Sequence, residues 1–276
     1  MIANPEPSTL PGMTTVIIFT MLKLSGLSIR LGGRLVVDDV NLTVEPGQTV
    51  GLIGGSGSGK TLTALGVLGL LPGAAHAEGH IGLGGIELCG APERRLRQVR
   101  GCRIGFVGQD ALAALNPLAT IGRHLCIPLR RHRGLNRREA ARAAGDLLER
   151  VGLAADTVRA YPAQLSGGQR QRAAIALAVA GRPGLLIADE PTSALDPPNQ
   201  AGILDLLRAL PPAADGRPTA LLLISHDLAV VARLCDRIAV MHDGCLVEQG
   251  DTAELIAAPS HPYTRALVAS ARALAA

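Results

Sequence analysis

The stretch from Thr49 to Thr61 combines residue types and a spacing that suit the binding of a phosphate group. Gly54 and Gly59 enclose four residues and are followed by Lys60 and Thr61, which matches the pattern G-x-x-x-x-G-K-[ST]. Glycines let successive backbone N–H groups turn toward a phosphate oxygen, because no Cβ atom stands in the way. Lys60 supplies a mobile positive charge for β- and γ-phosphates, and the Thr61 hydroxyl can join the coordination shell of Mg²⁺. The predicted nucleotide-binding residues of this loop are Gly54, Gly55, Ser56, Gly57, Ser58, Gly59, Lys60 and Thr61.

The residues on either side of this loop predict the elements that hold it in place. Val50 to Ile53 form a short apolar run that predicts a buried strand, and Thr61 to about Leu71 predict a helix that Pro72-Gly73 ends. Such a helix points the positive end of its dipole at a bound phosphate. A flexible Gly/Ser linker is the alternative interpretation of the loop, and the flanking strand and helix disfavour it.

Two further apolar runs end in residues that can act on a nucleotide. Residues 184–190 read Gly-Leu-Leu-Ile-Ala-Asp-Glu, an uninterrupted apolar strand that ends in two carboxylates. Adjacent acids at the end of a buried strand are costly unless a cation or solvent receives them. We therefore expect Asp189 to hold Mg²⁺ through water and Glu190 to face the γ-phosphate. Residues 219–225 form a similar run that ends in His226, and the carboxyl ends of such strands face one crevice.

A second anion-binding segment is predicted at the start of the helix that precedes the acidic strand. Residues 165–172 read Leu-Ser-Gly-Gly-Gln-Arg-Gln-Arg, so that a serine hydroxyl and two glycine N–H groups stand at a helix start. A plain helix N-cap at Ser166 is the alternative interpretation of this segment taken alone. One bound nucleotide does not need two such anion-binding segments from one chain.

The remaining chain predicts the elements around these motifs. Alternating apolar residues between 22 and 44 predict a small antiparallel sheet, and Ile81 to Leu88 and Ile104 to Val107 predict further strands. Residues 1–20 are proline-rich without positive charge, which predicts a disordered tail, with Met13 and Met21 as alternative start sites.

Helical patterns follow Gln109, which comes after the strand at 104–107. Ile121 to about Arg133 predict one helix, and Asn136 with Glu139 begins a second as a capping box. The predicted organisation is a tail at residues 1–20, a nucleotide-binding domain at residues 21–250 with an inserted helical subdomain at about 109–180, and a helical tail at residues 251–276.

The composition limits the class of protein and its partners. The chain has 276 residues, 47% of them hydrophobic, yet no apolar run approaches the roughly 20 residues that a membrane span requires. The net charge of +4 is compatible with nucleic acid, but aromatic residues make up only 1%, which leaves almost nothing for bases to stack on. Five dispersed cysteines without a C-x-x-C pair fit reduced thiols in a cytosolic protein. We therefore expect a soluble or peripheral protein that binds no nucleic acid.

Taken together, the motifs resemble those of the ATPase subunit of an ABC transporter. The matches are Gly54 to Thr61 with Walker A, Gln109 with the Q-loop, Leu165 to Gln169 with the LSGGQ signature, Leu185 to Glu190 with Walker B, Ser193 to Asp196 with the D-loop and His226 with the switch histidine. They stand in the family's order over about residues 22–250. Ala114 to Pro117 and His261 to Thr264 are similar to the branch of importers for oligopeptides, dipeptides and nickel.

The resemblance implies a fold, an activity and a set of partners. The implied fold is the ABC ATPase form of the P-loop NTPase fold, with a mainly parallel α/β core sheet, a small antiparallel β subdomain and an inserted α-helical subdomain. The implied activity is ATP hydrolysis that powers transport at the cytoplasmic face of the membrane. The implied partners are two transmembrane permease subunits, a second ATPase, identical or homologous, in a head-to-tail dimer, and indirectly an extracytoplasmic solute-binding protein.

The resemblance also implies roles for individual residues. Lys60, Gln109, Glu190 and His226 would be catalytic, and Thr61, Gln109 and Asp189 would serve Mg²⁺. Ser166, Gly167, Gly168, Gln169 and Asp196 would contribute to nucleotide binding, with Ser166 and Gly168 acting on the nucleotide of the partner subunit. The family places an aromatic ring under the adenine near the end of the first strand, where this chain offers Ile29 and Leu31. We expect Leu31 in that position and weaker nucleotide discrimination, since a ring contact contributes about 0.5–1.5 kcal/mol beyond burial.

Three functions compete on this sequence. The first is the ATPase of an importer for peptides or a nickel complex. Among transporters, an exporter is the alternative to an importer. The second is an ABC ATPase of DNA repair or translation, which carries a long coiled coil or two cassettes, and this sequence has neither. The third is a regulatory nucleotide-binding module without catalysis. It is disfavoured because the chain keeps the residues for catalysis and Mg²⁺ binding, namely Lys60, Asp189, Glu190 and His226.

Overall fold

The computed structural model describes residues 20–111, 113–193 and 195–275 of the chain. The tail predicted at residues 1–20 therefore lies outside the described residues except for Thr20, as does Ala194 of the D-loop segment. The strands are β1 (Leu22–Leu31), β2 (Arg34–Val44), β3 (Thr49–Ile53), β4 (Ala75–Leu83), β5 (Ile86–Glu87), β6 (Ile104–Val107), β7 (Leu185–Asp189), β8 (Ala220–Ser225), β9 (Arg237–His242) and β10 (Cys245–Asp251). The helices are α1 (Lys60–Leu68), α2 (Glu93–Val99), α3 (Ile121–Arg133), α4 (Arg137–Arg150), η1 (Ala155–Arg159), η2 (Pro162–Gln164), α5 (Gly167–Val179), α6 (Pro197–Arg208), α7 (Leu228–Leu234), α8 (Thr252–Ala257) and α9 (Pro262–Ala275).

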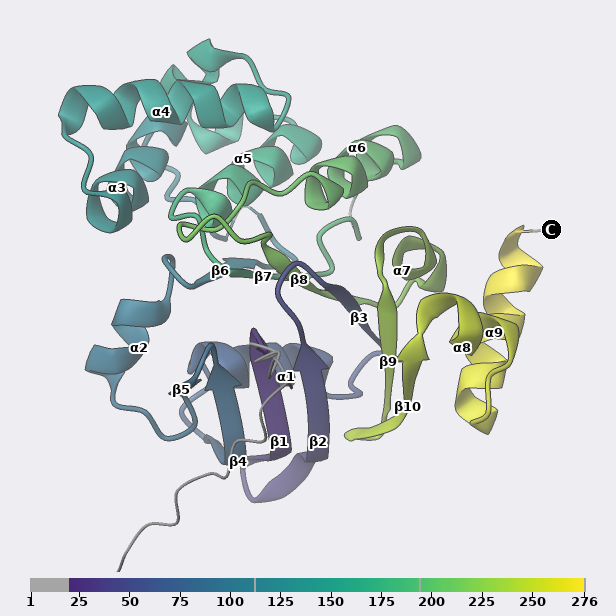
Figure 1. The fold of residues 1–276 in the computed structure, drawn as a ribbon. Coiled ribbons are helices and arrows are strands. Elements are labelled where there is room, and N and C mark those ends of the chain that lie inside the picture. The colour runs from purple at the N-terminus through teal and green to yellow at the C-terminus, as the bar shows by residue number, and fades with distance from the viewer. Residues whose placement is uncertain (1–19, 112, 194, 276) are drawn as a thin grey trace, which may run out of the picture.

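Two sheets form the frame of the molecule (Figure 1). The smaller one has the strand order β2-β1-β4-β5 and is antiparallel. The larger one has the order β10-β9-β3-β8-β7-β6 and is parallel except for its edge strand β10. The predicted fold, with a mainly parallel core sheet beside a small antiparallel one, is confirmed.

The uninterrupted apolar runs lie at the centre of the larger sheet. Every residue of β7 and of β8 is buried, because helices or the second sheet cover both faces of these strands. Helix α1 lies between the two sheets, and its buried residues pack with β1 and with one face of the core sheet. Helices α5 and α6 cover the opposite face of the core sheet. Helix α1, which follows the phosphate loop, and helix α5 therefore lie on different faces of the core sheet.

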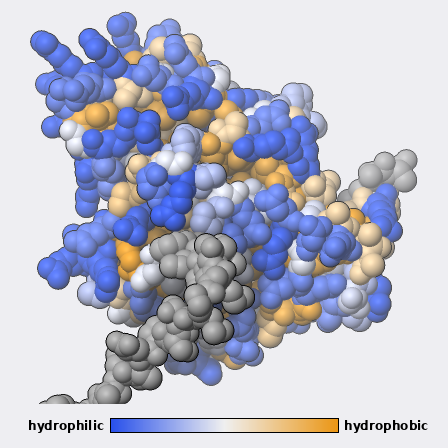
Figure 2. Space-filling view, in the orientation of Figure 1, coloured by the Kyte–Doolittle hydropathy of each residue, from blue (hydrophilic) through white to orange (hydrophobic). Residues whose placement is uncertain are grey.

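The helical layer forms where the sequence predicts it. Asn136 accepts hydrogen bonds from the backbone N–H groups of Arg138 and Glu139, at 2.9 and 3.0 Å, and the Glu139 carboxylate accepts from the Asn136 N–H at 2.8 Å. This capping box starts α4, and the apolar faces of α3 and α4 pack on α5. Outward-facing arginines at residues 130–131 and 137–138 are exposed, and hydrophilic side chains dominate the outer surface of this layer in Figure 2.

Two predicted elements differ from the structure. The helix after the phosphate loop ends at Leu68 and not near Leu71, because Gly69 takes the left-handed conformation with φ of 60° and caps it. The strand predicted at residues 81–88 is two strands, β4 and β5, joined by a turn at Gly84-Gly85 with φ values of 51° and 82°. Among the described residues no helix is both long enough and apolar enough to cross a lipid bilayer.

Candidate active site

The carboxyl ends of three neighbouring parallel strands bring the predicted catalytic residues together. Strands β3, β8 and β7 are hydrogen-bonded neighbours, and the residues that follow them are Gly54, His226 and Glu190. Gln109 follows β6, the next strand of the sheet. Because parallel strands all end at one edge, these side chains share a crevice, which confirms the convergence that the sequence predicts.

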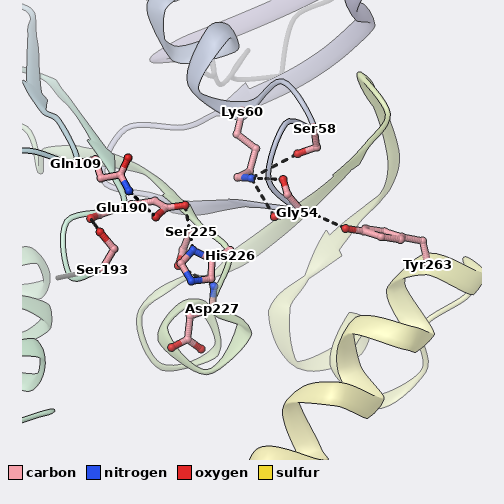
Figure 3. Close-up of polar contacts among 11 residues, drawn as sticks. Gly54, Ser58, Lys60, Gln109, Glu190, Ser193, Ser225, His226, Asp227 and Tyr263 are labelled. Carbon is pink, nitrogen blue, oxygen red and sulfur yellow. Dashed lines mark hydrogen bonds and ion pairs between the residues drawn. The ribbon is translucent and has the colours of Figure 1, made fainter. Parts of the chain in front are cut away.

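Lys60 is buried at the centre of this crevice with 6% of its surface exposed. Its Nζ donates to the carbonyl oxygens of Gly54 at 2.9 Å and Gly55 at 2.7 Å, and it lies 3.4 Å from Ser58 Oγ (Figure 3). Burial lowers the pKa of Lys60, and the nearby carboxylates of Glu190 and Asp189 oppose this effect. An ammonium group has three donors, and the longest of its three contacts here, to Ser58 Oγ, is the one that a phosphate oxygen can most readily replace.

The glycines of the loop are required by its conformation and by close neighbours. Gly57 and Gly59 have φ values of 77° and 103°, which side chains with a Cβ rarely adopt. A Cβ at Gly54 would collide with the carbonyl oxygen of Met241 at the end of β9. Gly59 is the N-cap of α1 and carries no side chain that could cap the helix. The first N–H groups of α1 are thus left for an anion.

Glu190 is held by partners on both sides of its carboxylate. Its Oε1 lies 3.0 Å from Nδ1 of His226, and its Oε2 accepts from Nε2 of Gln109 at 3.4 Å (Figure 3). Its backbone has φ of 46°, a strained conformation for a residue with a side chain. The backbone N–H of Glu190 donates to the carbonyl of Ile224 in β8 at 2.9 Å, which fixes that conformation. The Glu190 side chain is 19% exposed, so a water molecule can reach it.

Asp189, by contrast, is almost completely buried, with 4% of its surface exposed. Burial raises the pKa of Asp189, and the charge of Glu190 adds to that rise. A hydrogen bond from the Thr61 side chain and the charge of Lys60 lower it in part. Two of the three residues predicted to serve Mg²⁺, Asp189 and Thr61, are therefore in direct contact, whereas the third, Gln109, donates to Glu190.

The segment at residues 166–169 forms the helix start that the sequence predicts. Ser166 Oγ accepts from the Gln169 N–H at 3.2 Å, and Gln169 Oε1 accepts from the Ser166 N–H at 2.9 Å. A Cβ at Gly168 would lie 2.8 Å from Oδ1 of Asn199, so the glycine permits close packing of α5 on α6. Asp196 caps α6 by accepting from the Asn199 N–H at 2.9 Å.

The structure does not join this segment to the phosphate loop of the same chain. Gly167 lines a cavity of about 170 Å³ together with Gln109 and Glu190. No hydrogen bond between described residues connects residues 166–169 with residues 54–61. Ser166, Gly167 and Gln169 are exposed, so their polar groups face outward.

The two candidates for the adenine position differ in exposure. Ile29 is fully buried and packs beside Gly66 of α1, whereas Leu31 is 37% exposed at the end of β1. Residues i and i+2 of a strand share one face, so Leu31 lies on the α1 side, beyond Ile29. Of the two, only Leu31 has surface to offer a ligand.

One contact of the phosphate loop is not predicted by the sequence. Tyr263 Oη of α9 accepts a hydrogen bond from the Gly55 N–H at 2.8 Å (Figure 3). Tyr263 belongs to the segment His261 to Thr264, which resembles one branch of importers. The pattern of this segment does not predict that it lies beside the phosphate loop. Ser193 was predicted only as part of a D-loop, and its Oγ donates to the Glu190 carbonyl at 3.1 Å.

Known proteins with similar sequences are ATP-binding proteins of ABC transporters. Residues 37–193 match the family described as ABC transporter. A protein of Brucella melitensis biotype 1, provisionally named a peptide import ATP-binding protein, is 45% identical over 248 residues, which cover 86% of this chain and 72% of the relative. Escherichia coli K12 YejF, named an uncharacterized ABC transporter ATP-binding protein, is 46% identical over 262 residues, which cover 91% of this chain and 48% of YejF.

Solved structures of ABC transporter proteins also resemble the chain. The ATP-binding cassette MJ0796, solved as a dimer in a post-hydrolysis state with ADP and Pi, has a TM-score of 0.73 and 30% identity and covers 84% of this chain and 99% of its own. The Clostridium perfringens protein cbiO1, part of the ABC transporter complex cbiONQ, has a TM-score of 0.73 and 26% identity and covers 86% of this chain and 91% of its own. The chain therefore belongs to the ABC transporter family, as one of its ATP-binding subunits, and is an ATPase.

Proposed function

We propose that this chain powers the uptake of peptides or of a nickel complex through a membrane-bound importer. The observation that carries the proposal is the convergence of Lys60, Glu190, Gln109 and His226 on one crevice, in a chain 45% identical to a protein named for peptide import. The chain would act at the cytoplasmic face of the membrane as a peripheral subunit. The membrane subunits and the binding protein would choose the solute. The proposal therefore includes both peptides and a nickel complex as transported solutes.

Hydrolysis would use the partners already in place around Glu190. The Lys60 ammonium group and the backbone N–H groups of residues 54–59, other than the Gly55 N–H that donates to Tyr263, would hold the β- and γ-phosphates. The Glu190 carboxylate, fixed by His226 and Gln109, would orient a water molecule and accept its proton. His226 is 60% exposed at its side chain and bonded to Glu190, so it can turn toward the γ-phosphate and respond to its loss.

Thr61, Asp189 and Gln109 fit a Mg²⁺ ion that arrives with the nucleotide. They offer hydroxyl, carboxylate and amide oxygens, the hard ligands that Mg²⁺ prefers. The buried Asp189 carboxylate, whose pKa is raised by that burial, also gains from a nearby cation. When bound, Mg²⁺ would neutralise charge on the β- and γ-phosphates.

The exposed helix start at Ser166 would serve the nucleotide of a second ATPase subunit. Its outward-facing polar groups are not joined to the phosphate loop of the same chain, and a helix N-terminus attracts anions. The similar cassette MJ0796 was solved as a dimer. In a head-to-tail pair, Ser166, Gly167, Gly168 and Gln169 would contact the γ-phosphate held by the partner, and Asp196 would lie at the same interface.

The helical subdomain at about residues 109–180 would dock the two membrane subunits. Leu118 is 85% exposed and Ile127 is 61% exposed, and they are the most exposed large apolar side chains among the described residues. These two side chains are the contacts that we propose for the membrane subunits.

Purification of the tagged chain from its native membrane tests this proposal. We expect two multi-span subunits and a second ATPase to accompany it. In proteoliposomes with the binding protein outside, ATP inside should drive the solute inward. Movement of solute outward would indicate an exporter, and the recovery of no membrane subunit would contradict a transport function.

Leu31→Tyr is expected to tighten ATP binding by about two- to tenfold, because the ring adds an aromatic contact with adenine. The measurement is the dissociation constant of ATP for both proteins. Leu35→Tyr is the matched control, since Leu35 pairs with Arg30 and so lies on the opposite face of the hairpin from Leu31. An unchanged affinity in Leu31→Tyr would place the adenine elsewhere.

A further inference from the structure

The peptide group between Gly54 and Gly55 is held at both of its polar ends. Its carbonyl oxygen, from Gly54, accepts from Lys60 Nζ at 2.9 Å. Its N–H, from Gly55, donates to Tyr263 Oη at 2.8 Å. A trans peptide points these two groups in opposite directions within its plane, so Tyr263 and Lys60 lie at opposite edges of one peptide group. The Tyr263 bond therefore orients the carbonyl that receives Lys60.

This peptide group needs an external support. Residues 54 and 55 are both glycines, whose backbone torsions are far less restricted than those of other residues. A rotation of the peptide plane between them would turn the Gly54 carbonyl away from the ammonium group and present an N–H in its place. A hydrogen bond at the Gly55 N–H opposes that rotation.

Tyr263 is itself fixed at two places. Its ring stacks on His242 at the end of β9, with ring centroids 3.9 Å apart and planes inclined by 16°. The backbone before α9 is tied to β10, because the Glu248 carboxylate accepts from the N–H groups of Ser260 at 2.7 Å and His261 at 3.0 Å. The hydroxyl thus projects from a C-terminal helix that β9 and β10 hold against the phosphate loop (Figure 3).

We propose that Tyr263 is a positioning residue for nucleotide binding, which acts by fixing the Gly54–Gly55 peptide and through it the Lys60 ammonium group. It does not touch the nucleotide. The inference rests on the proposed function in one respect, namely that Lys60 and the loop hold the phosphates. It extends the site from the core sheet to α9, which is 208 residues from Gly55 in sequence.

Tyr263→Phe tests the inference, because it removes one oxygen and keeps the ring that stacks on His242. We expect the affinities for ATP and ADP to fall together by about two- to tenfold, the loss of one hydrogen bond. KM for ATP should rise in proportion, with kcat changed by less than about twofold. Tyr161→Phe is the control: it deletes the same atom from the other tyrosine of the chain, which lies 45% exposed before α5.

Gly55→Ala separates positioning from a general loss of stability. In the native protein its Cβ would lie 3.2 Å from Tyr263 Oη, so the single substitution should weaken ATP binding. The Gly55 backbone is not in the left-handed region, and without the tyrosine oxygen the methyl group has room. We therefore expect Gly55→Ala to improve ATP binding in the Tyr263→Phe background, because alanine restricts rotation of the peptide plane.

Wild-type affinities in Tyr263→Phe, or an equal loss in Tyr161→Phe, would overturn the inference. So would a further loss when Gly55→Ala is added to Tyr263→Phe. A wild-type protein that binds neither ATP nor ADP would instead overturn the proposed function, and this inference with it.

Discussion

Replacing Glu190 by glutamine is expected to lower ATP turnover by about 10²–10⁴-fold, the contribution of a general base. Glutamine keeps the size of the side chain and can still meet Gln109 and His226, but it cannot accept a proton from water. The phosphate-binding groups are untouched, because Lys60 contacts the loop carbonyls and not Glu190. ATP affinity should therefore stay within about twofold of wild type.

Single-turnover hydrolysis and ATP titration on the same preparation measure the two quantities. Glu254→Gln is the matched control, because Glu254 is an exposed glutamate of α8, on the C-terminal side of the molecule. Turnover near the wild-type rate in Glu190→Gln would remove Glu190 from the role of base. A parallel loss of ATP affinity would mean that the residue supports the loop and not the reaction.

Lys60→Ala is expected to weaken binding of ATP by about 10–10²-fold, since it deletes a bond from a charged donor worth about 1.5–3 kcal/mol. Lys60 also supplies a positive charge that interacts with Asp189 and Glu190 in the site. Its removal leaves two carboxylates facing the incoming phosphates without compensation. The loss should therefore exceed that of any other single side chain of the loop.

Titration with ATP at fixed ionic strength checks this prediction. Lys23→Ala is the control, because Lys23 is the other lysine of the chain and lies exposed on β1. Lys60→Arg should also bind poorly, since the site encloses a compact ammonium that is 6% exposed, and a planar guanidinium is larger and directs its donors differently. Near-normal binding in Lys60→Ala would contradict the assignment of the phosphate site.

The sequence predicts the site well because its residues follow buried strands. Asp189 and His226 come at the ends of apolar runs that only a central parallel sheet can cover on both faces. Their convergence follows from that geometry and does not depend on side-chain detail. The helix at 137–150 is predictable for a different reason, because Asn136 and Glu139 satisfy its first N–H groups locally.

Other features depend on contacts that no local pattern records. Helix α2 has seven residues with Leu96 and Val99 buried, too few to show a helical period. Strand β4 begins at Ala75, well before the predicted Ile81, because it pairs with β1 from Leu31 back to Leu22. The contact of Tyr263 with Gly55 joins residues that are 208 positions apart. Such features are decided by tertiary contacts, which override the weak preference of a short segment for helix or strand.

Sedimentation of the Glu190→Gln protein with Mg·ATP tests the claim that two subunits enclose each nucleotide. We expect a dimer with ATP and a monomer with ADP, either for this chain alone or for its mixture with the ATPase that accompanies it in the membrane. The dimer should be lost when Ser166→Glu places a negative charge at the exposed start of α5. A protein that binds ATP yet stays monomeric in both preparations would contradict the claim.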